Sequence, residues 1–303
     1  MNASAPTSPA ETRTGFLSAL LCYFWWGALL PVFLIALKSV PADQVLVHRI
    51  VWSVPFGALI IIFRKQIPEV ARALRQPKVM LAMLGSSAMI AVNWLIYIIA
   101  VQNERLFEAA LGYYINPLVY VLVGVVLLGE KLSVAKQVAV GLATVGVAIL
   151  TVYGGQFPTV SLILAVTFTA YGLLRKLTPI GAMPGLFIET LILTPVALGW
   201  LFFGPVQETA FGQDLGLTAL LVAAGPMTVI PLLAFAIAAR RLPLSVIGFL
   251  QFIGPTLQFL VGLLAGEAFT RPHQLCFAFI WTAVAVFAFD SIRSARKKPA
   301  VEG

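Results

Sequence analysis

The sequence predicts an all-α integral membrane protein of ten transmembrane helices, arranged as two inverted five-helix repeats. Three observations support this prediction: an apolar composition, a one-sided distribution of basic residues, and a resemblance between the two halves of the chain. Of the 303 residues, 60% are hydrophobic and only 11% are charged, and the mean hydropathy is +0.97. Soluble domains are about half apolar and about a quarter charged, so the composition argues against a soluble enzyme and against intrinsic disorder.

Ten segments are apolar over the length of about 20 residues that a helix needs to cross a bilayer. Their connections are short, so there is no room for an extramembrane catalytic domain. Residues 1–14 are polar and predict a disordered cytoplasmic tail instead of a signal peptide, and residues 291–303 predict a basic cytoplasmic tail. The predicted spans are 15–37, 44–63, 79–101, 106–128, 134–153, 159–177, 184–204, 214–239, 243–265 and 271–290.

The distribution of Lys and Arg predicts the orientation of these spans. With the N-terminus inside, 16 of the 20 Lys and Arg residues fall on inner segments, as the positive-inside rule requires. Lys38, Arg105 and Arg271 fall on outer segments, and Arg49 lies within a span. Both termini are therefore expected in the cytoplasm, and the net charge of +8 reflects membrane topology instead of nucleic-acid binding. The inner residues are Arg13, Arg64, Lys65, Arg72, Arg75, Lys78, Lys131, Lys136, Arg175, Lys176, Arg240, Arg241, Arg293, Arg296, Lys297 and Lys298.

The two halves of the chain resemble each other. The stretch that begins at Tyr97 aligns with the stretch that begins at Phe235, and both end in Gly-Glu, at Glu130 and Glu267. Because each half holds five spans, an odd number, the second half must cross the membrane in the opposite sense. Inverted repeats are typical of secondary transporters; duplication of a membrane scaffold without transport is the alternative. The two repeats are predicted at residues 15–153 and 158–290.

Two prolines mark the predicted substrate site. Pro117 lies near the middle of the fourth span, and Pro255 lies at the matching place in the ninth. Each proline removes a hydrogen bond to the carbonyl four residues earlier, which belongs to Tyr113 or Gln251. A carbonyl freed in lipid needs a protein partner or a wet cavity. Matched helix breaks at the midplane are typical of transporter sites, although prolines that only shape helix packing are the alternative.

Few ionisable side chains lie within the spans, and these are functional candidates because they are costly in lipid. Arg49 could pair with Glu108 or extend to the outer headgroups, and the sequence leaves both open. Glu189 could pair with Arg175, which could instead anchor the inner interface. We predict gating or coupling roles for His48, Arg49, Glu108 and Glu189; all but Arg49 are candidate proton carriers.

Polar and aromatic residues share helix faces in several spans. Asn93 and Tyr97 are four residues apart, so they lie on one face of the third span. An aromatic cavity with a few amide and hydroxyl groups would suit an amphipathic organic molecule, whereas the alternative for Trp and Tyr is the interfacial belt. The predicted substrate-binding residues are Tyr23, Trp26, Asn93, Trp94, Tyr97, Tyr113, Asn116, Tyr171 and Gln251.

Other function classes lack the residues that they require. The sequence has no Walker loop for ATP and no Ser, His and acid set for acyl transfer. His48 and His273 are its two histidines, and no metal-ligand cluster forms around them. Cys22 and Cys276 lie in apolar stretches and give no disulfide framework. We therefore predict no enzyme activity, no cofactor and no bound metal.

Two five-span repeats, each with a proline in a penultimate span that ends in Gly-Glu, resemble the EamA-type branch of the drug/metabolite transporter superfamily. Within this branch, five stretches distributed over both halves are similar to the RarD family. They are VPADQVLVHRIVWS (40–53), NWLIYIIAVQNERLFEAALGYYINPL (93–118), AYGLLRKL (170–177), GLFIET (185–190) and LSVIGFLQFIGPTLQFL (244–260).

This resemblance implies a multi-pass transporter of the bacterial inner membrane with a central cavity among spans 1–4 and 6–9. Spans 5 and 10 would serve as a scaffold or as the surface of a homodimer. Together with the repeat, it predicts a secondary transporter, an exporter of small organic metabolites, amino acids or amphipathic drugs by alternating access. The alternatives are a non-transporting membrane receptor or scaffold and an intramembrane lipid-modifying enzyme. The expected partners are a small-molecule substrate and the lipid bilayer, without nucleic acid.

Overall fold

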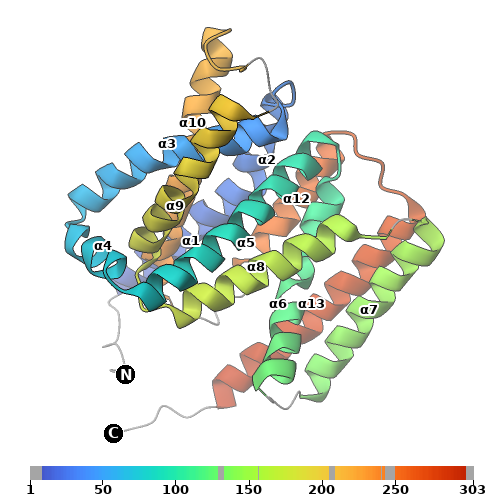
Figure 1. Cartoon of the computed structure of the whole chain (residues 1–303). Coiled ribbons are helices and arrows are strands. Elements are labelled where there is room, and N and C mark those ends of the chain that lie inside the picture. The colour runs from blue at the N-terminus through green and yellow to red at the C-terminus, as the bar shows by residue number, and fades with distance from the viewer. Residues whose placement is uncertain are drawn as a thin grey trace, which may run out of the picture.

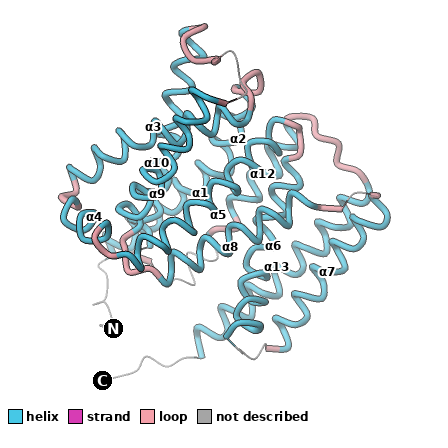
Figure 2. Tube along the Cα trace, in the orientation of Figure 1, coloured by secondary structure: helices cyan, strands magenta, loops and turns pink. Residues whose placement is uncertain are grey.

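The computed structural model describes residues 9–128, 133–155, 157–204, 209–239, 241–242 and 250–297, and in these residues it has helices and no strand. The predicted all-α class is therefore confirmed (Figures 1 and 2). The elements are α1 (Pro9–Phe24), the π-helix η1 (Trp25–Leu29), α2 (Leu30–Ala36), α3 (Ala42–Phe63), α4 (Ile67–Leu74), α5 (Pro77–Gln102), α6 (Leu106–Leu128), α7 (Val134–Gly154), α8 (Thr159–Leu177), α9 (Ala182–Phe203), α10 (Leu215–Ala239), α12 (Ile253–Leu264) and α13 (Arg271–Lys297).

Seven helices in the described part of the chain are long and apolar enough to cross a membrane. The first of them is continuous through α1, η1 and α2, and the others are α3, α5, α7, α9, α10 and α13. Helices α8 and α12 contain shorter apolar stretches, and α6 occupies the place of the predicted fourth span. Helices thus lie at all ten predicted positions, while the count of ten membrane crossings stays a prediction.

The helices at the two ends of the chain extend into the predicted tails. Helix α1 begins at Pro9, six residues before the predicted first span, and α13 continues to Lys297, beyond residue 290. Proline is favoured in the first turn of a helix, and the Ala, Glu and Arg residues of these segments are good helix formers. A polar composition therefore does not end these helices.

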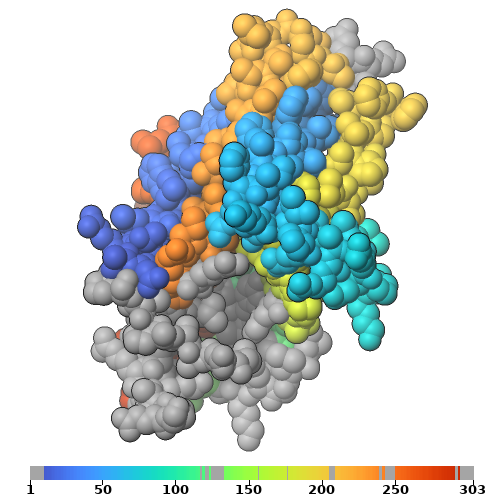
Figure 3. Space-filling model, turned by 90° about the vertical axis from the view of Figure 1, so that its left-hand side faces the viewer, coloured from blue at the N-terminus to red at the C-terminus, as the bar shows by residue number. Residues whose placement is uncertain are grey.

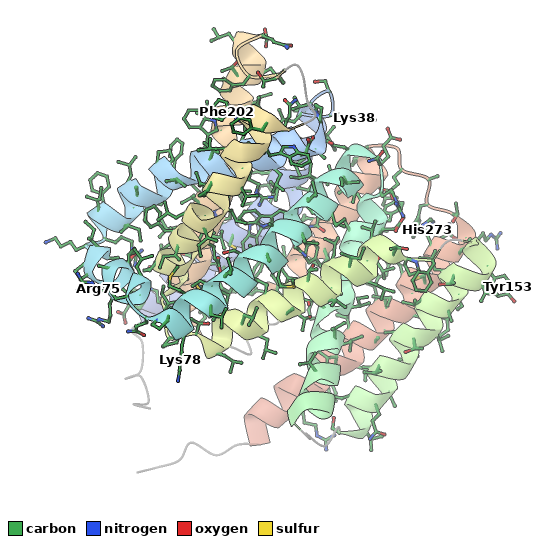
Figure 4. All side chains as sticks on the ribbon, viewed as in Figure 1. Lys38, Arg75, Lys78, Tyr153, Phe202 and His273 are labelled. Atoms are coloured by element: carbon green, nitrogen blue, oxygen red, sulfur yellow. The ribbon has the colours of Figure 1, made fainter. Side chains whose placement is uncertain are left out.

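Helix α4 lies in the segment 64–78, which the sequence predicts as a connection. Its Val70 and Ala73 are buried in an apolar cluster with Met183 of α9. Arg75 directly follows this helix, and Lys78 lies in the first turn of α5, whose far end lies beside Lys38 (Figure 4). Basic residues predicted for opposite sides of the membrane therefore lie at opposite ends of α5.

The helix pairs join the first half of the chain to the second. Helix α3 packs on α9, α6 on α12, and α7 on α13, while α5 packs on α8 as α1 packs on α10. By order along the two halves, α1 corresponds to α8, α3 to α9, α5 to α10, α6 to α12 and α7 to α13. Exchanging each helix for its counterpart leaves this set of pairs unchanged, as expected of interlocked repeats. Figure 3 shows one result of the pairing, with α10 lying between α1 and α3 on one face.

Helices α7 and α13 form a pair at one side of the bundle (Figure 1). Ala139 and Ala143 of α7 are buried, and a Cβ atom added to Gly146 would lie 3.0 Å from the carbonyl oxygen of Cys276. The small residues of α7 thus allow α13 to approach closely within the chain.

Candidate functional site

Helices of both halves bring polar and aromatic side chains together inside an otherwise apolar bundle. We call this set the central polar cluster. It draws on α3, α5, α6, α8 and α10, and every member except Tyr113 is buried. Its members are Arg49, Asn93, Trp94, Tyr97, Tyr113, Thr167 and Thr228.

Arg49 is buried in this cluster, with 4% of its surface exposed. Its Nε donates a hydrogen bond of 2.8 Å to Oγ1 of Thr228, and its guanidinium carbon lies 4.3 Å from the centre of the Trp94 ring. This geometry gives a cation–π contact. Arg49 does not pair with Glu108, because Glu108 pairs instead with Arg105 at 2.6 Å. Arg49 also does not extend to the outer headgroups, because it is buried.

Asn93 links α5 to α6 and α8. Its Nδ2 donates to the carbonyl oxygen of Leu164 and to Oγ1 of Thr167, both at 3.0 Å. Its Oδ1 accepts a hydrogen bond of 3.2 Å from the Tyr113 hydroxyl. The Tyr113 ring meets the Tyr97 ring edge-on, with centroids 5.9 Å apart. Asn93 and Tyr97 thus face the same cluster, as their spacing predicts.

Glu189 of α9 forms a second buried polar group. Its Oε1 accepts a hydrogen bond of 2.7 Å from Ser86, and its Oε2 accepts one of 3.3 Å from Tyr171. Nε of Arg175 lies 3.7 Å from Oε1, and Nη2 of Arg175 also donates to the carbonyl of Gly181. Of the two roles left open for Arg175, pairing with Glu189 is therefore the one found.

The remaining predicted residues make other contacts, although Trp26 packs in the same apolar cluster as Tyr97 and Tyr113. Tyr23 and Trp26 meet edge-on, 6.2 Å between ring centroids, on the first span. Asn116 accepts a hydrogen bond of 2.6 Å from Thr169. Nδ1 of His48 accepts one of 3.2 Å from Trp52.

The ninth span is broken beside Pro255, which lies in the first turn of α12, directly after a turn at Gln251 and Phe252. The carbonyl of Gln251 accepts a hydrogen bond of 3.2 Å from the amide of Gly254. Pro255 predicts a free carbonyl at Gln251. The turn instead provides that carbonyl with a hydrogen-bond donor. Residues 243–249 and the Pro117 side chain lie outside the described part.

A pocket of about 370 Å³ lies away from the central polar cluster, beside α4 and the connection between α8 and α9. Its lining contains none of the predicted site residues. The polar lining residues are Lys65, Gln66, Glu69, Arg72 and Gln76.

Sequence reasoning missed the hydroxyl groups that hold the buried polar side chains. Thr228, Thr167 and Ser86 each bind a predicted residue from another helix. Thr and Ser are common in transmembrane helices, and their partner across a helix interface has no local sequence signal. The π-helix η1 also has no signal in the sequence, although such turns often occur at functional sites.

Comparisons with known proteins give one consistent result. The model of the EamA-like transporter family matches residues 13–152. The uncharacterized transporter PA0485 of Pseudomonas aeruginosa is 45% identical over 295 residues, which cover 96% of this chain and 98% of that protein. Protein RarD of Escherichia coli is 40% identical over 290 residues, 95% of this chain and 98% of that protein.

One solved crystal structure shares the fold. It aligns with 94% of this chain and 100% of its own chain, with a TM-score of 0.58 and 22% sequence identity. At this identity the likeness shows the fold alone.

Proposed function

The chain belongs to the EamA-like transporter family, within its RarD branch and the drug/metabolite transporter superfamily, and we propose that it transports small organic molecules by alternating access. The proposed substrates are metabolites, amino acids or amphipathic drugs, and the proposed direction is export across the bacterial inner membrane. The transport is secondary, because no ATP-binding loop is present in the sequence.

The central polar cluster is the observation that carries this proposal. A buried arginine and a hydrogen-bonded asparagine are costly at membrane depth, and a bundle that served only as a scaffold would be more stable without them. Arg49 bonds to Thr228, and Asn93 bonds to Thr167. Each bond joins the first half of the chain to the second, so movement between the halves would reshape the cluster.

Glu189 is the proposed coupling residue. It is fully buried, and its contacts with Ser86, Tyr171 and Arg175 join α5 and α8 to α9. Protonation of this carboxylate would remove its attraction for Arg175 and loosen the contact. Proton binding at Glu189 would in this way favour one arrangement of the halves over the other.

Flux in proteoliposomes tests the proposed function. Uptake and efflux of amino acids and aromatic drugs are measured with and without an imposed pH gradient. Flux that follows the gradient supports a proton-coupled transporter, and flux indifferent to it supports facilitated diffusion. Absence of flux for every compound, from protein shown to be folded and inserted, would contradict transport and favour a receptor or scaffold.

A further inference from the structure

The charge balance of the buried residues points to the chemistry of the substrate. Among the residues whose burial the structure describes, three charged side chains are buried: Arg49, Glu108 and Glu189. Glu108 pairs with Arg105 and Glu189 pairs with Arg175. No acidic group of the described residues lies within ion-pair distance of Arg49. Its positive charge is therefore the one buried charge of these three without a counter-ion.

The guanidinium of Arg49 also has an unused hydrogen-bond donor. Its Nε is occupied by Thr228 and its face by Trp94, whereas its Nη1 is buried without a hydrogen-bond partner. A buried donor without a partner is costly, and a charged donor is more so. The position is seven residues inside the first residue of α3, about 10 Å along the helix axis, so the outer headgroups are not its partner at 4% exposure.

A second unpartnered donor belongs to the same cluster. The hydroxyl of Tyr97 is buried without a hydrogen-bond partner, and the side chain is 2% exposed. Tyr97 lies three residues after Trp94 on α5, so both lie on one face of that helix, and the Trp94 ring contacts the guanidinium of Arg49. The hydroxyl of Tyr113 is already bonded to Asn93, which leaves Arg49 and Tyr97 to bind an incoming acceptor.

We propose that Arg49 and Tyr97 bind the carboxylate of an amphipathic monocarboxylic acid, and that this acid is the class of substrate transported. A carboxylate oxygen accepts from both donors and cancels the single charge, and guanidinium groups match carboxylate geometry. A phosphate dianion would leave an excess negative charge, because Arg49 is the one uncompensated cation of the buried charges described above. The aromatic rings of Trp94, Tyr113 and Phe168 supply apolar surface for the body of the molecule.

This inference rests on the proposed transport function for its biological meaning, but a binding measurement tests it without flux. The thermal unfolding of the purified full chain is followed with 3-phenylpropanoate and with its neutral amide, 3-phenylpropanamide. The two probes have nearly the same shape, but the acid carries a negative charge and the amide is neutral. Because hydrogen bonds to charged groups are among the strong ones, the acid is expected to bind the wild-type protein at least about tenfold more tightly than the amide.

Three variants assign the discrimination to its residues. Arg49→Met should bind acid and amide equally, and Tyr97→Phe, which removes one hydroxyl, should weaken acid binding by about fivefold or more. Lys38→Gln removes a cation at the protein surface, 52% exposed, and should retain full discrimination. The Tyr97→Phe variant keeps the test valid if Arg49→Met does not fold.

Several results would overturn the proposal. The first is that the wild-type protein binds acid and amide equally, or binds neither. The second is that Arg49→Met still discriminates between them, or that Tyr97→Phe binds the acid as tightly as the wild-type protein does. The third is that chloride or inorganic phosphate at the same concentration protects the protein as well as the acid does. Flux of neutral compounds without any preference for acids would contradict this inference while leaving the transport function in place. Preferential acid binding without flux would contradict transport, of the acid included, while leaving the carboxylate-binding role of Arg49 and Tyr97 in place.

Discussion

Glu267 caps the helix that begins beside Phe107. Its Oε1 and Oε2 accept hydrogen bonds from the Phe107 amide at 3.0 and 3.2 Å. Glu267 follows α12 in the second half of the chain, whereas Phe107 lies in the first turn of α6 in the first half. A carboxylate at a helix N-terminus satisfies an amide without an intrahelical partner and interacts favourably with the helix dipole. These hydrogen bonds therefore join the two halves of the chain at the predicted outer side of the membrane.

The Glu267 carboxyl predicts a dependence of stability on pH. Partial burial raises its pKa to about 7, although the hydrogen bonds from Phe107 and Leu106 oppose this shift. Because the folded state then holds a proton that the unfolded state releases near pH 4.5, stability contributed by this group falls as pH rises from about 4.5 to about 7. Glu267→Gln should remove that fall, which thermal unfolding between pH 4.5 and 8 would measure.

Glu104→Gln is the matched control for this prediction. Glu104 lies on the surface, where the hydrogen bond from Lys38 lowers its pKa. Protonation of Glu104 therefore favours the unfolded state, whereas protonation of Glu267 favours the folded state. From pH 5 to 8 Glu104→Gln should still lose stability, but by less than the wild-type protein, because the negative charge of Glu104 contributes to the raised pKa of Glu267. Parallel curves for the wild-type protein and Glu267→Gln would instead show that the proton at Glu267 has no such effect.

The pair of Arg175 and Glu189 predicts a non-additive effect of mutation. Arg175→Met leaves the buried Glu189 carboxylate without its counter-ion, and breaking buried pairs typically costs about 3–5 kcal/mol. The double variant Arg175→Met with Glu189→Gln should recover most of this loss, because the neutral amide removes the unpaired charge and keeps one acceptor oxygen for Ser86. A single variant as stable as the wild-type protein, or a double variant no better than the single, would argue against the pair.

Gly27 is a position at which we expect a side chain not to be tolerated. It lies in η1, and an added Cβ would lie 2.6 Å from the carbonyl oxygen of Gly254, so Gly27→Ala should cost about 1–3 kcal/mol of stability. Gly199→Ala is the control, since no described atom outside the neighbouring backbone of its own helix lies within 4 Å of the added carbon and alanine is the better helix former by about 1 kcal/mol. Thermal unfolding of both variants gives the comparison, and equal stability would rule out the close contact.

Tyr113 and Gln251 test whether the predicted midplane site is used in transport. Tyr113→Ala removes the hydroxyl that donates to Asn93, and Gln251→Ala changes the turn that precedes α12. Both variants should alter flux without lowering membrane expression, measured by proteoliposome transport and by quantification of protein in the membrane. Normal transport in both would exclude a midplane site at these residues.

The positions of the helices could be predicted from the sequence because each apolar segment carries its own signal. Helix α4 was missed because only Val70 and Ala73 of its short sequence are buried, too few for a periodic pattern to be recognised. Helices α1 and α13 continue beyond the predicted spans because an apolar boundary is not a helix boundary. Pro9 and the polar residues that follow it continue the first helix beyond the predicted lipid region.

The candidate site could be predicted in residue type but only in part in its contacts. Arg49, Asn93 and Glu189 stand out in the sequence because polar residues are rare within apolar spans. Their partners depend on which helices pack together, and the sequence gives depth without the direction of each helix face. Depth alone allowed Arg49 to pair with Glu108, whereas the packing of α3 on α10 places Thr228 beside it.

Counterflow in proteoliposomes is the decisive measurement for transport through the central polar cluster. Vesicles loaded with an unlabelled carboxylate should transiently accumulate the labelled compound when they contain the wild-type protein or Lys38→Gln. Arg49→Met, inserted and folded to the same extent, should lose most of this accumulation. Equal accumulation with Arg49→Met would contradict the role of Arg49, and absence of accumulation with the wild-type protein for every compound tested would contradict transport itself.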